Sequence, residues 1–359
     1  MLSPFLDVCV ILIQMFNDVT VSKDNLIDSL YKVMCTGTHT ASDSKVSNND
    51  YFKRRVLGFR AEIEFEDAII NSNKGFKFLE GGMFFSPKLD GSKSMKNSFL
   101  YVTFDTLPPD EYTNIYSKIS SWNEVERLIY VQLNLNHWTE ESFTVKIDGK
   151  LCSTNILVPV YEFYDFDFRN QSFTKSNNEP NDFFSILSIG RERKNKAPTF
   201  ALRKRDHFDF FNDYDLDTLK KIYANRYFVD NKKRQVVLHM IDFDGFIIHE
   251  DKIFIVEIKE KSPIKDKKEP EDLNKWSYGW DTRRLLWYKH IQQKIGFDVL
   301  YNIRQINNRD ERKFIQWDSI FLSDFLKGVS WSSVRGGGGG EDTLIVPYLH
   351  FKRLEENLI

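Results

Sequence analysis

Hydrophobic residues alternate with polar ones in some segments of the chain and recur every three to four residues in others. The first pattern predicts strands and the second predicts helices. Predicted strands are rich in β-branched and aromatic residues and are bounded by turn-forming residues. They lie at residues 75–87, 97–106, 155–168, 236–248, 253–261, 298–306 and 343–351. Predicted helices lie at residues 1–16, 54–71, 122–133, 216–228, 281–297 and 318–326.

Polar segments divide this pattern. Residues 174–182, TKSNNEPND, are the best candidate for a boundary between an N-terminal region, 1–180, and a C-terminal region, 181–359. Asp281 and Gly296 stand where an N-cap and a C-terminal stop are expected for the helix between them. Strands and helices occur on both sides of the boundary, so the sequence predicts an α/β protein.

Net charge gives no indication of a nucleic-acid partner. The 359 residues include 50 basic and 52 acidic ones, for a formal net charge of −2. Any site for a polyanion must therefore arise from local clustering. A basic cluster between residues 191 and 205 predicts either phosphate contacts or a solvated loop beside the acidic segment that follows it. Its basic members are Arg191, Arg193, Lys194, Lys196, Arg203, Lys204 and Arg205.

The cysteines, the apolar N-terminal residues and a glycine run indicate the cellular compartment and argue against some kinds of site. The three cysteines are far apart and form no CxxC pair, which argues against a zinc ribbon and fits a reducing cytoplasm. The apolar residues 1–16 lack a basic segment and a cleavage site, so a buried helix is favoured over a signal peptide. No other run is long enough to span a bilayer. The pentaglycine 336–340 is not followed by GK[ST], so it indicates a linker, a flexible hinge or a loop that approaches DNA closely rather than a nucleotide site.

The hairpin VVLHMIDFDGFIIHEDKIFIVEIKEK, residues 236–261, carries charged residues inside apolar runs. A turn at 249–252 would pair Ile248 with Ile253, because paired residues are then counted outward from the turn. The same count places Asp244 opposite Glu257. Two carboxylates facing each other among Ile and Phe require a cation between them or a raised pKa.

Mg²⁺ fits such a pair because it usually takes one or two protein carboxylates and completes its shell with water and phosphate oxygens. Lys259 lies on the same face as Glu257, where its ammonium group would orient a water or neutralise charge on a phosphate. A plain cross-strand ion pair between Asp242 and Lys259 is the alternative, because the same count places these two residues opposite each other.

IDFDGFIIHEDKIFIVEIKEK resembles the motif of the PD-(D/E)XK nucleases, in which an acid on one strand precedes Glu-x-Lys on its partner. The resemblance extends over residues 216–306 and is greatest to type II restriction endonucleases. It implies a restriction-endonuclease-like core, with a mixed central sheet flanked by helices, and an N-terminal elaboration for DNA recognition. It also implies that Asp244, Glu257 and the Ile258 carbonyl bind Mg²⁺ and that Lys259 assists the attacking water. Asp242 remains an alternative to Asp244.

The resemblance adds further expectations. Such nucleases sometimes take a glutamate from a helix before the core; Glu62 is the candidate, and a solvated helix face is the alternative. Arg283, Arg284 and Lys289 would reach DNA or form an ordinary charged helix face. The implied activity is Mg²⁺-dependent cleavage of double-stranded DNA, most simply site-specific, by a homodimer paired with a DNA methyltransferase. A repair, recombination or phage-defence nuclease and an inactive DNA-binding module are the alternatives.

Overall fold

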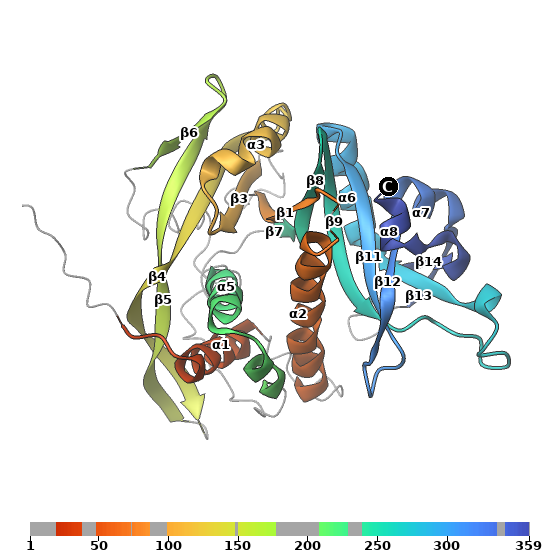
Figure 1. Cartoon of the computed structure of the whole chain (residues 1–359), viewed down its shortest axis with the longest axis horizontal. Coiled ribbons are helices and arrows are strands. Elements are labelled where there is room, and N and C mark those ends of the chain that lie inside the picture. The colour runs from red at the N-terminus through yellow and green to blue at the C-terminus, as the bar shows by residue number, and fades with distance from the viewer. Residues whose placement is uncertain are drawn as a thin grey trace, which may run out of the picture.

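A computed structural model describes residues 19–37, 48–72, 74–86, 99–147, 150–176, 208–228, 239–335 and 342–358. Three predicted features lie outside these residues: the helix 1–16, the basic cluster 191–205 and the pentaglycine 336–340. The described residues form an α/β structure with mixed sheets flanked by helices (Figure 1). Among them, no helix is both long enough and apolar enough to cross a membrane.

Sheet A is a mixed sheet of six strands with helices on both faces. β9 (Lys252–Lys261) and β11 (Asp298–Ile306) are parallel and are connected through α6 (Thr282–Ile295), which covers one face of the sheet. α2 (Asn48–Ile70) packs on β9 from the other face. Eight of the nine residues of β11 are buried, as expected for a strand covered on both sides. The strand order is β1 (Lys77–Glu80), β8 (Gly245–His249), β9 (Lys252–Lys261), β11 (Asp298–Ile306), β12 (Phe314–Phe321) and β15 (Lys352–Arg353).

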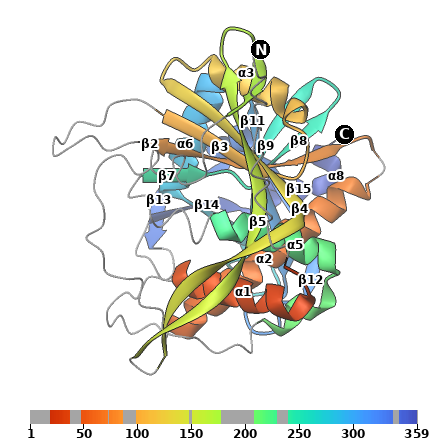
Figure 2. The same cartoon turned by 90° about the vertical axis from the view of Figure 1, so that its left-hand side faces the viewer.

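Sheet B contains a long hairpin of β4 (Val125–Ile147) and β5 (Lys150–Asp167), which runs across the molecule in Figure 2. α1 (Lys23–Gly37) and α5 (Leu216–Arg226) pack against this hairpin on one face, and α3 (Thr113–Ser120) packs on the other. The strand order is β6 (Ser172–Lys175), β5 (Lys150–Asp167), β4 (Val125–Ile147), β3 (Phe99–Asp105), β2 (Gly82–Ser86) and β7 (His239–Asp242).

A third, three-stranded sheet, sheet C, lies beside α6. It consists of β10 (Ser277–Asp281), β14 (Asp342–Pro347) and β13 (Ser330–Arg335). Two short helices, α7 (Leu322–Gly328) and α8 (Leu354–Asn357), complete the C-terminal part.

Two strand pairs pass from sheet A to sheet B at one crossing point. β1 continues into β2 at Gly81, and β7 continues into β8 through Phe243 and Asp244. A Cβ atom on Gly81 would lie 2.0 Å from the Phe243 carbonyl oxygen, so only glycine allows the backbones to come this close. The predicted boundary near residue 180 therefore does not separate the sheets, because β1 belongs to sheet A and β7 to sheet B.

Several predicted elements are confirmed. The α2, α5, β3, β5 and β11 segments have the type that their patterns indicate. In α6, the Asp281 side chain accepts a hydrogen bond from the backbone N–H of Arg284 at 3.0 Å, and Gly296 ends the helix with φ 76°.

Two helix predictions need correction. The segment 122–133 enters β4 at Val125, and residues 128–131 are all buried, because α3 covers one face of this strand and α1 with α5 cover the other. Four consecutive apolar residues suit such a strand better than a one-sided helix. The segment 318–326 is divided between the end of β12 and the start of α7.

Candidate metal and catalytic site

The β8–β9 hairpin has the predicted register. Ile248 pairs with Ile253, and a tighter turn than expected joins them, since His249 also pairs with Lys252. β8 begins at Gly245, so Asp244 stands one residue before the ladder, next to the strand that carries Glu257. The chain bends into sheet B at this point.

The Asp244 carboxylate is held against β9 rather than projecting into solvent. Its Oδ2 atom accepts a hydrogen bond from the backbone N–H of Ile258 at 2.6 Å and lies 3.2 Å from Lys259 Nζ. The side chain is 10 % exposed. The bend at the sheet crossing therefore places Asp244 beside Ile258 and Lys259.

Glu257 is fully buried, and its two carboxylate oxygens have different partners. Oε2 accepts hydrogen bonds from Arg284 and from the Tyr288 hydroxyl, each at 2.5 Å. Oε1 forms an ion pair with Lys259 Nζ at 2.9 Å, and no other donor among the described residues contacts it. Glu257 is thus fixed through one oxygen, while the other points to the centre of the site.

Three oxygen atoms converge on the Lys259 ammonium group. Asp244 Oδ2, Glu257 Oε1 and the Ile258 carbonyl oxygen lie 3.2, 2.9 and 2.9 Å from Lys259 Nζ. These are the three groups that the resemblance to the PD-(D/E)XK nucleases implies as Mg²⁺ ligands. The ammonium group thus lies between these three oxygen atoms. About a third of the Lys259 side chain is exposed.

The two carboxylates have opposite pKa shifts. Burial, together with the neighbouring charge of Glu257, raises the pKa of Asp244 to about 7. Burial would also raise the pKa of Glu257, but Arg284 and Lys259 outweigh it and lower that pKa below its usual value. Burial disfavours the charged form of Lys259, yet Asp244 and Glu257 raise its pKa, so it remains an ammonium ion. The predicted strain between facing carboxylates therefore falls on Asp244.

The contacts of Asp242 and Arg284 were not predicted from the sequence. Asp242 lies at the end of β7 in sheet B, and its Oδ1 accepts a hydrogen bond from Arg284 at 2.8 Å. The alternative Asp242–Lys259 pair is thus replaced by an Asp242–Arg284 pair, because the chain changes sheets between Asp242 and β8. Arg284 joins Asp242 to Glu257, so its guanidinium already pairs with two carboxylates. Its contact with DNA stays a prediction.

Arg284 and Tyr288 were missed as partners of Glu257. They are four residues apart on α6, and this spacing puts both side chains on the same helix face. The spacing of four residues can be read from the sequence, but the sequence does not show that this face of α6 packs on β9.

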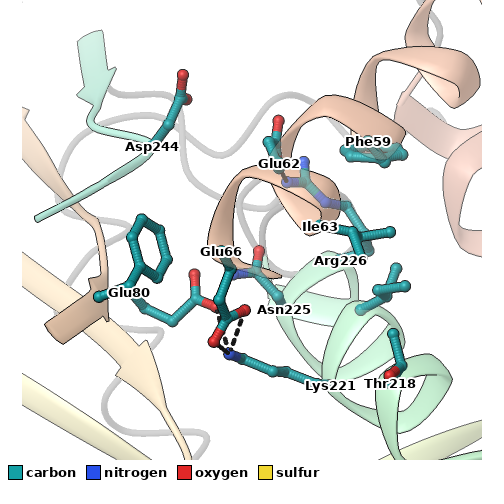
Figure 3. Close-up of a pocket in the computed structure, with 12 residues that line it drawn as sticks. Phe59, Glu62, Ile63, Glu66, Glu80, Thr218, Lys221, Asn225, Arg226 and Asp244 are labelled. Carbon is teal, nitrogen blue, oxygen red and sulfur yellow. Dashed lines mark hydrogen bonds and ion pairs between the residues drawn. The ribbon is translucent and has the colours of Figure 1, made fainter. Parts of the chain in front are cut away.

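Glu62 lies near Asp244, in a small pocket of about 70 Å³ between α2, α5 and β1 (Figure 3). Asp244 also lines this pocket, and the charge of Glu62 contributes to the raised pKa of Asp244. Arg226 of α5 forms an ion pair with Glu62 at 3.0 Å. The structure thus brings Glu62 towards the site, where it is paired with an arginine while about a third of its side chain remains exposed.

The same pocket contains a second ionic group (Figure 3). Lys221 of α5 bridges Glu66 of α2 and Glu80 of β1, with distances of 2.6 and 3.2 Å from its Nζ. Burial raises the pKa of Glu80 to about 7, although Lys221 acts against this shift. Two ion pairs, Lys221–Glu66 and Arg226–Glu62, therefore link α5 to α2.

The other residues proposed to contact DNA stay predictions. Arg283 is exposed on α6 and Lys289 is half-buried on the same helix. Arg191, Arg193, Lys194, Lys196, Arg203, Lys204 and Arg205 all lie outside the described residues.

Comparisons of the chain with protein-family models, with curated proteins and with solved structures gave no match. Within the described part of the chain, no group of three or more His, Cys, Asp or Glu side chains is placed to hold a metal ion. The site under consideration instead offers two carboxylates and a main-chain carbonyl, with Glu62 nearby.

Proposed function

We propose that the protein is a Mg²⁺-dependent endonuclease that hydrolyses phosphodiester bonds of double-stranded DNA. The observation that carries the proposal is the convergence of Asp244 Oδ2, Glu257 Oε1 and the Ile258 carbonyl oxygen on one cationic atom. Two carboxylate oxygens and a carbonyl oxygen are ligands that suit Mg²⁺. The buried Glu257 Oε1 atom has the Lys259 ammonium group as its one close partner among the described residues, and a divalent cation would take the place of that group.

In this proposal Asp244, Glu257 and the Ile258 carbonyl hold the metal. Bound Mg²⁺ would make a water more acidic and would offset charge on the phosphate. Arg284 and Tyr288 fix the second oxygen of Glu257, so Oε1 keeps its direction. Lys259 stays protonated and donates to the phosphate or to the attacking water rather than accepting a proton from it.

The restriction-endonuclease-like core is also a proposal. It is supported by the Glu-x-Lys strand β9, the connection through α6 to the parallel strand β11, and the position of α2 on the opposite face of sheet A. Sheet B with its helices would then supply DNA recognition. Site-specific cleavage by a homodimer, in partnership with a methyltransferase, is what the sequence resemblance adds.

A catalytically inactive DNA-binding module is the second candidate. It is favoured by the pairing of Lys259 with both Asp244 and Glu257, because this pairing balances buried charge without a metal. In such a module the ammonium group would remain where it is when divalent cations are added.

Incubation of the purified protein with plasmid DNA and Mg²⁺ tests the proposal. Discrete fragments support a site-specific enzyme, and a smear supports a repair, recombination or phage-defence nuclease. Binding without cleavage supports the inactive module. Glu257→Gln should lose cleavage, whereas Glu250→Gln, an exposed residue at the hairpin turn, should keep it. Equal cleavage by both variants would remove Glu257 from the active site.

A further inference from the structure

Lys261 is a half-buried lysine on the same face of β9 as Glu257 and Lys259. Its Nζ atom donates to the Gly279 carbonyl oxygen of β10 and lies 5.6 Å from the centre of the Tyr301 ring. Among the described residues, no carboxylate lies within ion-pair distance of this ammonium group. A buried cation without a counter-ion is unfavourable, and burial together with the charge of Lys259 lowers the pKa of Lys261 to about 8.

Gln305 is the neighbour of Lys261 across the parallel β9–β11 pair. Paired residues in parallel strands project from the same face of a sheet, so both side chains lie on the face that carries Lys259. Gln305 is 4 % exposed, and its amide oxygen has no hydrogen-bond partner in the described part of the chain. The amide nitrogen is not among the fully buried polar atoms, so its N–H groups are the ones that can reach an anion.

These two side chains form an anion-binding arrangement next to the proposed catalytic residues. An ammonium group has three donors, and among the described residues Lys261 uses one of them, in its contact with Gly279. Lys259 and Lys261 are two residues apart along an extended strand, so their Cα atoms are about 6.6–6.8 Å apart. This separation is comparable with that of consecutive phosphates in one nucleic-acid strand.

We propose that Lys261 and Gln305 form a second phosphate subsite, which binds the DNA phosphate next to the one that reacts at Lys259. The inference rests on the proposed nuclease function and extends it by a positioning contact. Lys261 supplies the charge and Gln305 supplies a neutral donor. The bound phosphate is the counter-ion that the buried ammonium group lacks.

The charge of Lys261 is tested by the salt dependence of DNA binding. Affinity for a short fluorescein-labelled duplex is measured by anisotropy in Ca²⁺, between about 50 and 200 mM salt. Loss of one phosphate contact lowers the slope of log K against log salt by about 0.9. Over this range the wild-type affinity should therefore fall about 3.5-fold more than that of Lys261→Met. Lys261→Arg should restore the slope, and Lys327→Met, at an exposed residue of α7, should leave it unchanged.

Gln305→Glu separates a binding role from a structural one. The new carboxylate would pair with Lys261 in the free protein, so the melting temperature should stay equal or rise. The same carboxylate would repel a phosphate, so DNA affinity should fall, and by more than in Gln305→Leu. If Lys261 merely tied β9 to β10, Lys261→Met would lower the melting temperature without changing the salt slope.

The outcomes distinguish the inference from the function on which it rests. If the wild-type protein cuts DNA but the salt slope of Lys261→Met equals that of the wild type, the subsite is wrong and the nuclease stands. If the wild-type protein neither binds nor cuts DNA in the presence of Mg²⁺, both proposals fail.

Discussion

Replacing Asp244 with Asn is expected to stabilise the metal-free protein at neutral pH while abolishing cleavage. Burial and the charge of Glu257 raise the pKa of Asp244 from 3.8 to about 7. One pKa unit corresponds to about 1.36 kcal/mol, so ionised Asp244 destabilises the folded state by about 4 kcal/mol at pH 8. Asparagine removes this cost and still offers an oxygen to the backbone N–H of Ile258.

The corresponding change in melting temperature follows from the size of the chain. Unfolding entropy is about 2.1 cal/mol/K per residue, which gives about 0.75 kcal/mol/K for 359 residues. The variant should therefore melt about 5–6 °C above the wild type at pH 8.

The pH dependence has a definite sign. Because the pKa of Asp244 is higher in the folded chain than in the unfolded chain, the folded state holds more protons between pH about 4 and 7. The unfolding free energy contributed by Asp244 therefore falls as pH rises through this window. The advantage of Asp244→Asn should be largest above pH 7 and should vanish towards pH 4.

Thermal unfolding of both proteins in a chelating buffer, over a series of pH values, measures this difference. Asp251→Asn, at an exposed residue of the hairpin turn, is the matched control and should track the wild type at every pH. The reasoning is refuted if Asp244→Asn is no more stable than the wild type at pH 8, or if its advantage does not depend on pH.

Three further predictions concern the same group of charges. Glu257→Gln should destabilise the metal-free protein by about 3–5 kcal/mol, because Arg284 and Lys259 lose a buried partner. The variant should also lose the rise in melting temperature that Ca²⁺ or Mg²⁺ gives the wild type. A melting temperature of the metal-free variant equal to that of the wild type would contradict this. Asp244→Asn should reduce single-turnover cleavage more than Asp242→Asn, since Asp242 pairs with Arg284 outside the converging oxygens, and the reverse order would make Asp242 the ligand. Lys259→Ala should abolish cleavage but keep duplex binding in Ca²⁺, as measured by anisotropy, and retained cleavage would remove Lys259 from the mechanism.

The local pattern of the hairpin was sufficient to predict its register. A turn and two apolar strands leave little freedom once one pair is placed, and Ile248 indeed pairs with Ile253. The cap residues of α6 were predictable for the same reason, because Asp281 and Gly296 act within one turn of the helix.

The partners of the charged residues were harder to predict because they depend on contacts between distant elements. Asp242 lies two residues before Asp244 but belongs to sheet B, whereas Asp244 directly precedes a strand of sheet A. The chain changes sheets at Phe243, where it packs closely against Gly81. Arg284 reaches Glu257 because α6 packs across β9, which no local pattern specifies. The prediction of a helix at 122–133 was wrong for a similar reason. This segment enters β4, and a strand covered on both faces has no polar side that would reveal its alternation.

The central claim is that Asp244, Glu257 and the Ile258 carbonyl bind a divalent cation. Crystals of the protein with a short DNA duplex and Mn²⁺, a scatterer that prefers the same ligands as Mg²⁺, allow anomalous diffraction to locate the ion directly. We expect an anomalous peak within coordination distance of Asp244 Oδ2, Glu257 Oε1 and the Ile258 carbonyl oxygen, with Lys259 Nζ displaced towards the DNA phosphate. A duplex-bound structure in which Lys259 Nζ remains between the two carboxylates and no peak lies beside them would contradict the account.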